Sequence, residues 1–252
     1  MRFHHLFAYL IFAVSTAHAQ EPSVARAAKI QDAIDAVFPG KQFVIWNSIE
    51  GDFNGDGVND FAAVVVSYTT EGAREERLLV MAGGSDGRFT PLSVSGEFCK
   101  VDKFYNLSAS PAGKSFEVEG VGSADATHSG SFTFKFRYNT KLRDFELIGR
   151  EDHSVDYDAN SSYKVSVNYL TKEILLARQL GKNYIDRHTA ADGSEKIIER
   201  TRRAAKLKEA KMRFDSSMLF RLQGFDCARF WDTDPAANPP LYIDENFKIQ
   251  SQ

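Results

Sequence analysis

One short segment, in which four of five alternate positions have an oxygen-bearing side chain, runs directly into an apolar stretch. The segment Asp52-Phe-Asn-Gly-Asp-Gly-Val-Asn-Asp60 contains two glycines, which permit a tight turn. The stretch Phe61-Ala-Ala-Val-Val-Val66 is rich in β-branched residues and indicates a buried strand. This junction constrains the fold most, because it predicts a loop that opens into a strand and not into a helix.

The spacing of oxygen atoms in residues 52–60 is typical of a calcium loop. The side chains of alternate residues would point inward, and one backbone carbonyl would complete the shell. Oxygen ligands of this hard type favour calcium over zinc or copper. The predicted ligands are Asp52, Asn54, Asp56, the carbonyl of Val58, and Asp60. A β-turn without metal is the alternative, because Asp, Asn and Gly are also common in turns.

The same residues distinguish this loop from an EF-hand. An EF-hand loop has glutamate at its twelfth position and continues as a helix, whereas this chain has Ala63 there and continues as a strand. The segment resembles instead the calcium loop of FG-GAP and VCBS-type repeats of exported proteins. The resemblance implies calcium ligation by the five residues named above. It extends from about Phe43 to Phe89, and the chain has a single good copy of the motif, whereas complete propellers have several.

The N-terminus has the three parts of a secretory signal peptide. Arg2 precedes an apolar run from Leu6 to Val14, and small residues end the segment at Ala19. We therefore expect cleavage of residues 1–19, leaving one β-rich domain over residues 20–252. No segment approaches the roughly 20 apolar residues that a membrane span needs, so the mature chain is expected to lack one and to be periplasmic or secreted.

The mature chain would retain two cysteines, Cys99 and Cys227. In an oxidising compartment, such a pair is most simply interpreted as one disulfide. Two free buried thiols are the alternative. Neither cysteine lies in a C-x-x-C pair, which disfavours thiol catalysis.

The rest of the sequence predicts a mainly β protein. Residues 23–38 have helical spacing of apolar residues and end at Pro39-Gly40, which predicts one N-terminal α-helix. Turn-separated strand patterns follow, so we expect an antiparallel β-meander of propeller-like, sandwich or open-barrel type. The predicted strands are residues 42–46, 61–68, 77–82, 115–121, 131–138, 144–149 and 162–170.

Three further segments have informative patterns. Residues 131–138 alternate aromatic and polar side chains, which predicts a strand with one packed face; a sugar-binding platform is the alternative. Residues 195–213 are rich in Lys and Arg among apolar residues and indicate a possible helix with a solvated face. The cluster of Asp152, His153, Asp156 and Asp158 is interpreted as a solvated turn.

The sequence favours a binding or structural role over an enzymatic one. It contains no G-x-S-x-G elbow, no H-E-x-x-H motif and no phosphate-binding glycine loop. A formal net charge of −3 argues against a nucleic-acid partner. We expect an exported calcium-binding protein whose ion stabilises a loop and the strand after it, with an envelope protein or glycan as a candidate partner. The alternative is an exported hydrolase of polysaccharide or peptide, because paired carboxylates need to meet only in space.

Overall fold

The computed structural model describes residues 24–68, 72–99, 104–110, 114–123, 128–189, 195–202, 205–215, 219–234, 236, 241–243 and 248–251. The expected signal peptide lies outside these residues. The helices are α1 (Val24–Val37) and α2 (Cys227–Thr233). The strands are β1 (Val44–Gly51), β2 (Asp60–Tyr68), β3 (Arg74–Gly83), β4 (Phe89–Val94), β5 (Phe104–Ala109), β6 (Ser115–Ser123), β7 (His128–Asn139), β8 (Asp144–Asp156), β9 (Ser161–Asn168), β10 (Glu173–Leu180), β11 (Asn183–Thr189), β12 (Glu195–Thr201), β13 (Lys206–Arg213), β14 (Leu241–Ile243) and β15 (Ile249–Ser251).

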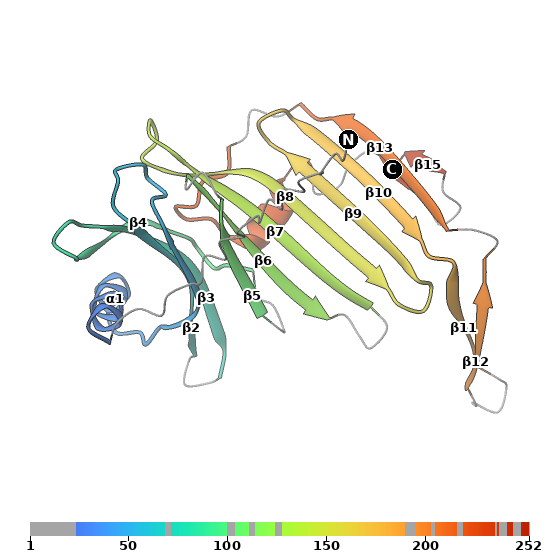
Figure 1. Cartoon of the computed structure of the whole chain (residues 1–252), viewed down its shortest axis with the longest axis horizontal. Coiled ribbons are helices and arrows are strands. Elements are labelled where there is room, and N and C mark those ends of the chain that lie inside the picture. The colour runs from blue at the N-terminus through green and yellow to red at the C-terminus, as the bar shows by residue number, and fades with distance from the viewer. Residues whose placement is uncertain are drawn as a thin grey trace, which may run out of the picture.

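The strands form two main antiparallel sheets. Sheet A has the order β1-β2-β3-β4, and sheet B has the order β13-β10-β9-β8-β7-β6-β5. The hairpin of β11 and β12 extends from the far end of sheet B (Figure 1). Sheets A and B meet where β1 lies beside β5, and the side-chain amide of Asn47 donates to the carbonyl of Tyr105 there at 2.9 Å. The prediction of a mainly β, antiparallel meander with an N-terminal helix is confirmed.

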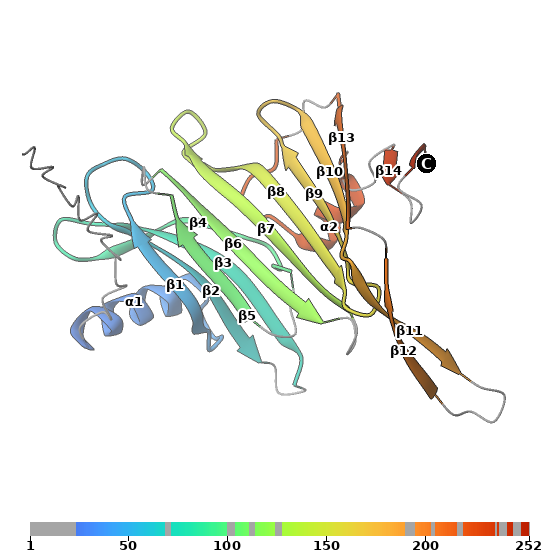
Figure 2. The ribbon, with the colours of Figure 1, turned by 45° about the vertical axis from the view of Figure 1, so that its right-hand side comes forward.

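Helix α1 covers the outer face of sheet A, as Figure 2 shows. Ile30 and Ile34 of the helix pack against a layer of sheet residues that includes Ala63 and Leu79. The opposite face of sheet A contacts the main core, so β2 is buried along nearly its whole length. This burial on both faces explains why the Phe61–Val66 stretch is continuously apolar and does not alternate.

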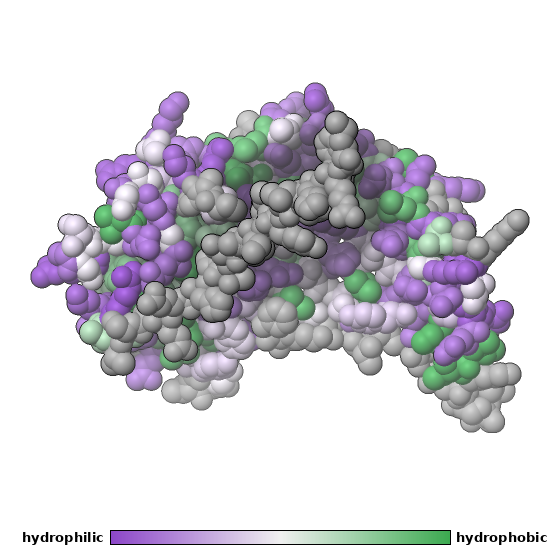
Figure 3. All heavy atoms as spheres, viewed as in Figure 1, coloured by the Kyte–Doolittle hydropathy of each residue, from purple (hydrophilic) through white to green (hydrophobic). Residues whose placement is uncertain are grey.

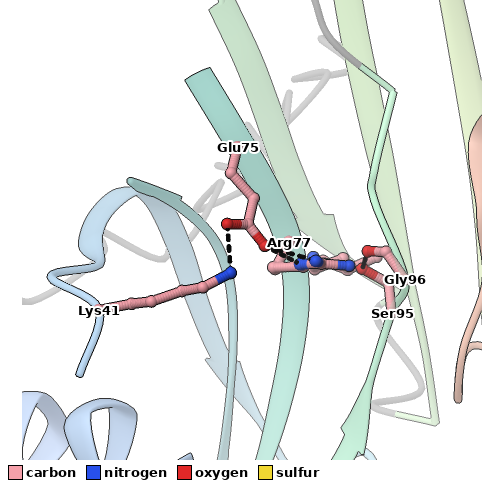
Figure 4. Close-up of polar contacts among 6 residues, drawn as sticks. Lys41, Glu75, Arg77, Ser95 and Gly96 are labelled. Atoms are coloured by element: carbon pink, nitrogen blue, oxygen red, sulfur yellow. Dashed lines mark hydrogen bonds and ion pairs between the residues drawn. The ribbon is translucent and has the colours of Figure 1, made fainter. Parts of the chain in front are cut away.

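A hydrogen-bonded cluster ties the segment after α1 to sheet A (Figure 4). Glu75 of β3 accepts a hydrogen bond from the Nζ of Lys41 at 2.6 Å and another from the Nε of Arg77 at 3.0 Å. Burial alone would raise the pKa of Glu75, but the two cationic partners outweigh this effect and hold the pKa below its usual value. The cluster therefore fixes the chain between α1 and β1 against β3.

The main core lies between sheet B, sheet A and the C-terminal segment around α2. The alternation in residues 131–138 is confirmed as a packed strand face, since Phe134 and Phe136 are fully buried in β7. Phe134 packs edge to face against Phe225 and Phe230 from the C-terminal segment. The aromatic stripe therefore belongs to the core and does not form an exposed platform.

The predicted disulfide is confirmed between Cys99, which follows β4, and Cys227 at the start of α2. Their Cα atoms lie 5.1 Å apart, within the usual range for a disulfide. The bond joins positions separated by 128 residues in sequence. It therefore holds α2 close to the segment that connects the two sheets.

The predicted helix near residues 195–213 is wrong, because these residues form β12 and β13. Strand β13 pairs with β10 along its whole length, with Ala210 opposite Leu176 and Met212 opposite Ile174. Ala210 and Met212 pack against the core, whereas Glu209, Lys211 and Arg213 are exposed. Pairing with the edge of sheet B thus overrides a weak helical preference.

Candidate metal centre

The loop predicted to bind calcium connects β1 to β2. Gly55 and Gly57 have φ angles of 81° and 86°, a backbone region that favours glycine. These two residues curl the loop so that backbone N–H groups point toward its own side chains. The Oδ1 of Asp52 accepts hydrogen bonds from the N–H groups of Gly55 at 2.8 Å and of Asp56 at 3.0 Å. Its Oδ2 accepts a third, from Gly57, at 3.0 Å.

Asn54 and Asp56 continue this pattern of side chains that accept from the local backbone. The Oδ1 of Asn54 accepts from the N–H of Asp56, and the Oδ1 of Asp56 accepts from the N–H of Val58, each at 2.8 Å. The side-chain NH2 group of Asn54 donates to Asp56 at 2.9 Å and to Asp60 at 3.2 Å. The structure thus brings together the four predicted ligand side chains in one hydrogen-bonded network.

Asp60 is the buried end of the loop and the first residue of β2. Its Oδ2 accepts from the N–H groups of Phe53 and Asn54, both at 2.9 Å. Its Oδ1 accepts from the N–H of Gly83 at the end of β3, at 3.2 Å. Burial raises the pKa of Asp60, although these backbone hydrogen bonds act in the opposite direction. One carboxylate therefore joins the loop to two strands of sheet A.

The contact with β3 requires glycine at position 83. A Cβ atom placed on Gly83 would lie 2.0 Å from the carbonyl oxygen of Asn59, an impossible contact. Because Gly83 lets the two backbones approach closely, its N–H can reach Asp60. The predicted ligand at Val58 is its carbonyl, which accepts no hydrogen bond from the residues that the structure describes.

The loop has an excess of negative charge. In the described part of the chain, Asp52, Asp56 and Asp60 form no ion pair with Lys, Arg or His, although the side chain of Lys114 passes close to Gly55. The donor set, three carboxylates and one amide, fits a hard cation such as calcium. The NH2 group of Asn54 supplies a partial positive charge between two of these carboxylates. In the conformation that the structure describes, no group of three or more His, Cys, Asp or Glu residues among the described residues is spaced to hold a metal ion.

A second carboxylate cluster, in which Arg150 joins Asp152 to Asp234, was not predicted from the sequence. Arg150 of β8 and Asp234, which follows α2, form a hydrogen-bonded ion pair between two buried side chains. The Nε of Arg150 lies 2.8 Å from Asp152, and the hydroxyl of Tyr169 donates to Asp234 at 2.8 Å. Arg150 also donates to the carbonyl of Ala236 at 3.1 Å. We call Arg150, Asp152, Tyr169 and Asp234 the arginine cluster.

The interpretation of Asp152, His153 and Asp156 as part of a solvated turn is wrong, because all three lie within β8. Asp152 pairs in register with Val165 and His153 with Lys164 of β9. The turn begins only at Tyr157. Asp152 faces the core side of sheet B, where burial raises its pKa to about 6 despite the neighbouring Arg150. The long hairpin of β8 and β9 therefore includes Asp152, His153 and Asp156.

Comparison with known proteins assigns this chain to no family. Among the described residues, no helix is long and apolar enough to cross a membrane. No family model, curated protein or solved structure matches this chain. The similarity to the FG-GAP and VCBS-type loop therefore depends only on the residues of the loop.

Proposed function

We propose that this protein is an exported, β-rich protein of binding or structural type in which one calcium ion stabilises the loop of residues 52–60 and the start of β2. The ligands would be Asp52, Asn54, Asp56, the carbonyl of Val58, and Asp60. The ion would supply the positive charge that these side chains lack among their described neighbours. The signal-peptide pattern and the disulfide support an extracytoplasmic location, where disulfides persist.

The observation that carries the proposal is the position of Asp60. This fully buried carboxylate shares a network with Asp52 and Asp56 and has no ion pair with a described cationic side chain. A buried carboxylate without a countercharge is costly, and a bound cation lowers that cost. Because Asp60 also bonds to Gly83, binding at the loop would stabilise the pairing of β2 with β3.

Calorimetric unfolding in calcium and in a chelator tests the proposal. We expect a higher Tm in calcium than in EGTA for the natural chain, because a ligand that binds only the folded state stabilises it. The substitution Asp56→Ala should abolish this calcium-dependent difference. Equilibrium dialysis should give one bound calcium for the natural chain and none for the variant.

Asp86 provides a matched control in the same sheet. It lies in the turn between β3 and β4, and its Oδ1 accepts a hydrogen bond from the N–H of Arg88 at 3.0 Å, so it is also a turn aspartate. Asp86→Ala should leave the calcium-dependent difference in Tm intact. The proposal fails if the natural chain melts at the same temperature in both buffers and retains no calcium on dialysis.

A further inference from the structure

The outer face of sheet B, opposite the core, contains a broad hollow with a volume of about 770 Å³. The residues that line it come from strands β6 to β10 and from β13. Outside the grey residues, hydrophilic side chains predominate on the face of the molecule that Figure 3 shows. The lining consists of Glu117, Thr133, Lys135, Gly149, Arg150, Glu151, Ser166, Val167, Asn168, Glu173, Leu175 and Lys211. We call this feature the sheet hollow.

Gly149 lies at the centre of the sheet hollow. The register across the sheet places Lys135 on one side of it and Asn168 on the other. Adjacent strands are separated by about 4.8 Å, so the missing side chain leaves about 10 Å between the strands that flank it. Gly149 also adjoins the irregularity in β8 where the register with β7 shifts. Such positions often mark the close approach of a ligand.

Neither backbone conformation nor packing requires glycine at position 149. Its φ angle lies outside the left-handed region. A Cβ atom placed there would lie 3.6 Å from the Cβ of Lys135 and 3.6 Å from the carbonyl oxygen of Val167, which are ordinary contacts. Glycine in a strand interior weakens the strand relative to alanine. What glycine does provide here is a partly exposed backbone surface on the floor of the hollow.

The charges around the hollow neutralise one another. Glu117 pairs with Lys135 at 2.7 Å, and Glu173 pairs with Lys211 at 2.9 Å. Glu151 pairs with Lys164 at 2.8 Å. An anionic ligand would meet the carboxylates and a cationic ligand would meet the ammonium groups. A hydroxyl group, in contrast, can donate to the carboxylate and accept from the ammonium of the same pair.

We propose that the sheet hollow binds a neutral oligosaccharide. The paired Lys and Glu side chains and the hydroxyls of Thr133 and Ser166 would contact sugar hydroxyls. The half-exposed side chain of Leu175 offers an apolar surface for the C–H face of a sugar ring. The volume of the hollow is within the range of small-ligand sites, and its walls are rigid because they belong to paired strands. This proposal is independent of calcium binding, since the loop belongs to sheet A.

Isothermal titration calorimetry with maltotriose, cellotriose and N-acetylchitotriose tests the proposal, with trigalacturonate as an anionic comparison. We expect at least one neutral trisaccharide to bind with a dissociation constant of about 1 mM or tighter, and trigalacturonate to bind at least about tenfold more weakly. Gly149→Ala should weaken binding while the Tm stays equal or rises. Gly149→Leu should fill the floor and weaken binding at least about tenfold.

Gly122 is the matched control. It lies in β6 of the same sheet, and a Cβ atom there would meet nothing within 4 Å. Gly122→Ala should leave trisaccharide binding unchanged. Asp56→Ala, which removes a calcium-loop ligand, should also leave it unchanged. The proposal is overturned if no neutral trisaccharide binds at 10 mM, a concentration about tenfold above the expected dissociation constant. It is also overturned if Gly149→Leu and Gly122→Ala have equal effects, or if trigalacturonate binds more tightly than the neutral sugars.

Discussion

The loop of residues 52–60 and the arginine cluster both gather carboxylates, but they stabilise the negative charges by different means. In the loop, backbone N–H groups from the same nine-residue segment surround Asp52 and Asp60. In the cluster, the guanidinium of Arg150 pairs with Asp152 and Asp234, the second of which lies 84 residues further along the chain. The first arrangement provides hydrogen-bond donors without a full positive charge, whereas the second contains its own cation.

This difference predicts how each region responds to its surroundings. Side chains that depend on an external cation should change in stability with the calcium concentration. A buried ion pair that is complete within the chain should not respond to calcium, but it should be sensitive to loss of either partner. The substitutions below separate these two behaviours.

Removal of the cation from the arginine cluster should have the largest effect. Arg150→Met keeps most of the side-chain length but leaves Asp234 buried without a countercharge, so we expect a loss of about 3–5 kcal/mol in the free energy of unfolding. Urea denaturation measures this loss, and its size should be the same in calcium and in EGTA. Adding Asp234→Asn to Arg150→Met should recover part of the stability. A loss below about 1 kcal/mol would mean that the cluster is a surface-type ion pair.

Removal of one charge from the loop should have a smaller effect that depends on calcium. At a calcium concentration about 100 times the dissociation constant, bound calcium contributes about 2.7 kcal/mol. Asp56→Asn should lose most of that contribution in calcium. In EGTA it should be neutral or slightly stabilising, because it removes repulsion among Asp52, Asp56 and Asp60. Equal losses in the two buffers would contradict the comparison and assign Asp56 a purely structural role.

The same contrast separates what could be predicted from the sequence from what could not. The loop, helix α1 and the aromatic face of β7 each follow from a pattern within about fifteen residues of chain. Local spacing determines these features, and the structure contains the expected elements. The Cys99–Cys227 disulfide could also be predicted despite its long range, because the chain offers one pair of cysteines outside the expected signal peptide.

Features that depend on distant partners could not be predicted. Arg150 and Asp234 are ordinary charged residues in the sequence, and only the position of α2 over sheet B brings them together. Residues 206–213 have enough Lys, Glu, Ala and Leu for a helix, yet the free edge of β10 recruits them as a strand. Gly149 gives no signal in the sequence either, because its position in the sheet hollow follows from the register of β7, β8 and β9.

Protonation of Asp152 should produce the smallest effect, and its sign is opposite to that of most carboxylates. Burial raises the pKa of Asp152 from 3.8 to about 6 in the folded state, so the folded state binds this proton more tightly than the unfolded state. The stability that protonated Asp152 contributes to the folded state is fully present below pH 3.8 and is lost as the pH rises to about 6. Asp152→Asn should remove this loss. The resulting gain in the free energy of unfolding should be less than about 2 kcal/mol, because the side chain is partly exposed and screened.

Calorimetry of both chains in EGTA between pH 4 and pH 6.5 measures the difference, which should grow with pH in favour of Asp152→Asn. Glu75 provides a control of opposite sign, because Lys41 and Arg77 hold its pKa below 4.5. Its contribution is present above that pH and is lost as the pH falls, so Glu75→Gln should be relatively most harmful at the upper end of the range. If Asp152→Asn follows the Glu75→Gln trend, Arg150 outweighs burial at Asp152 and keeps that carboxylate ionised.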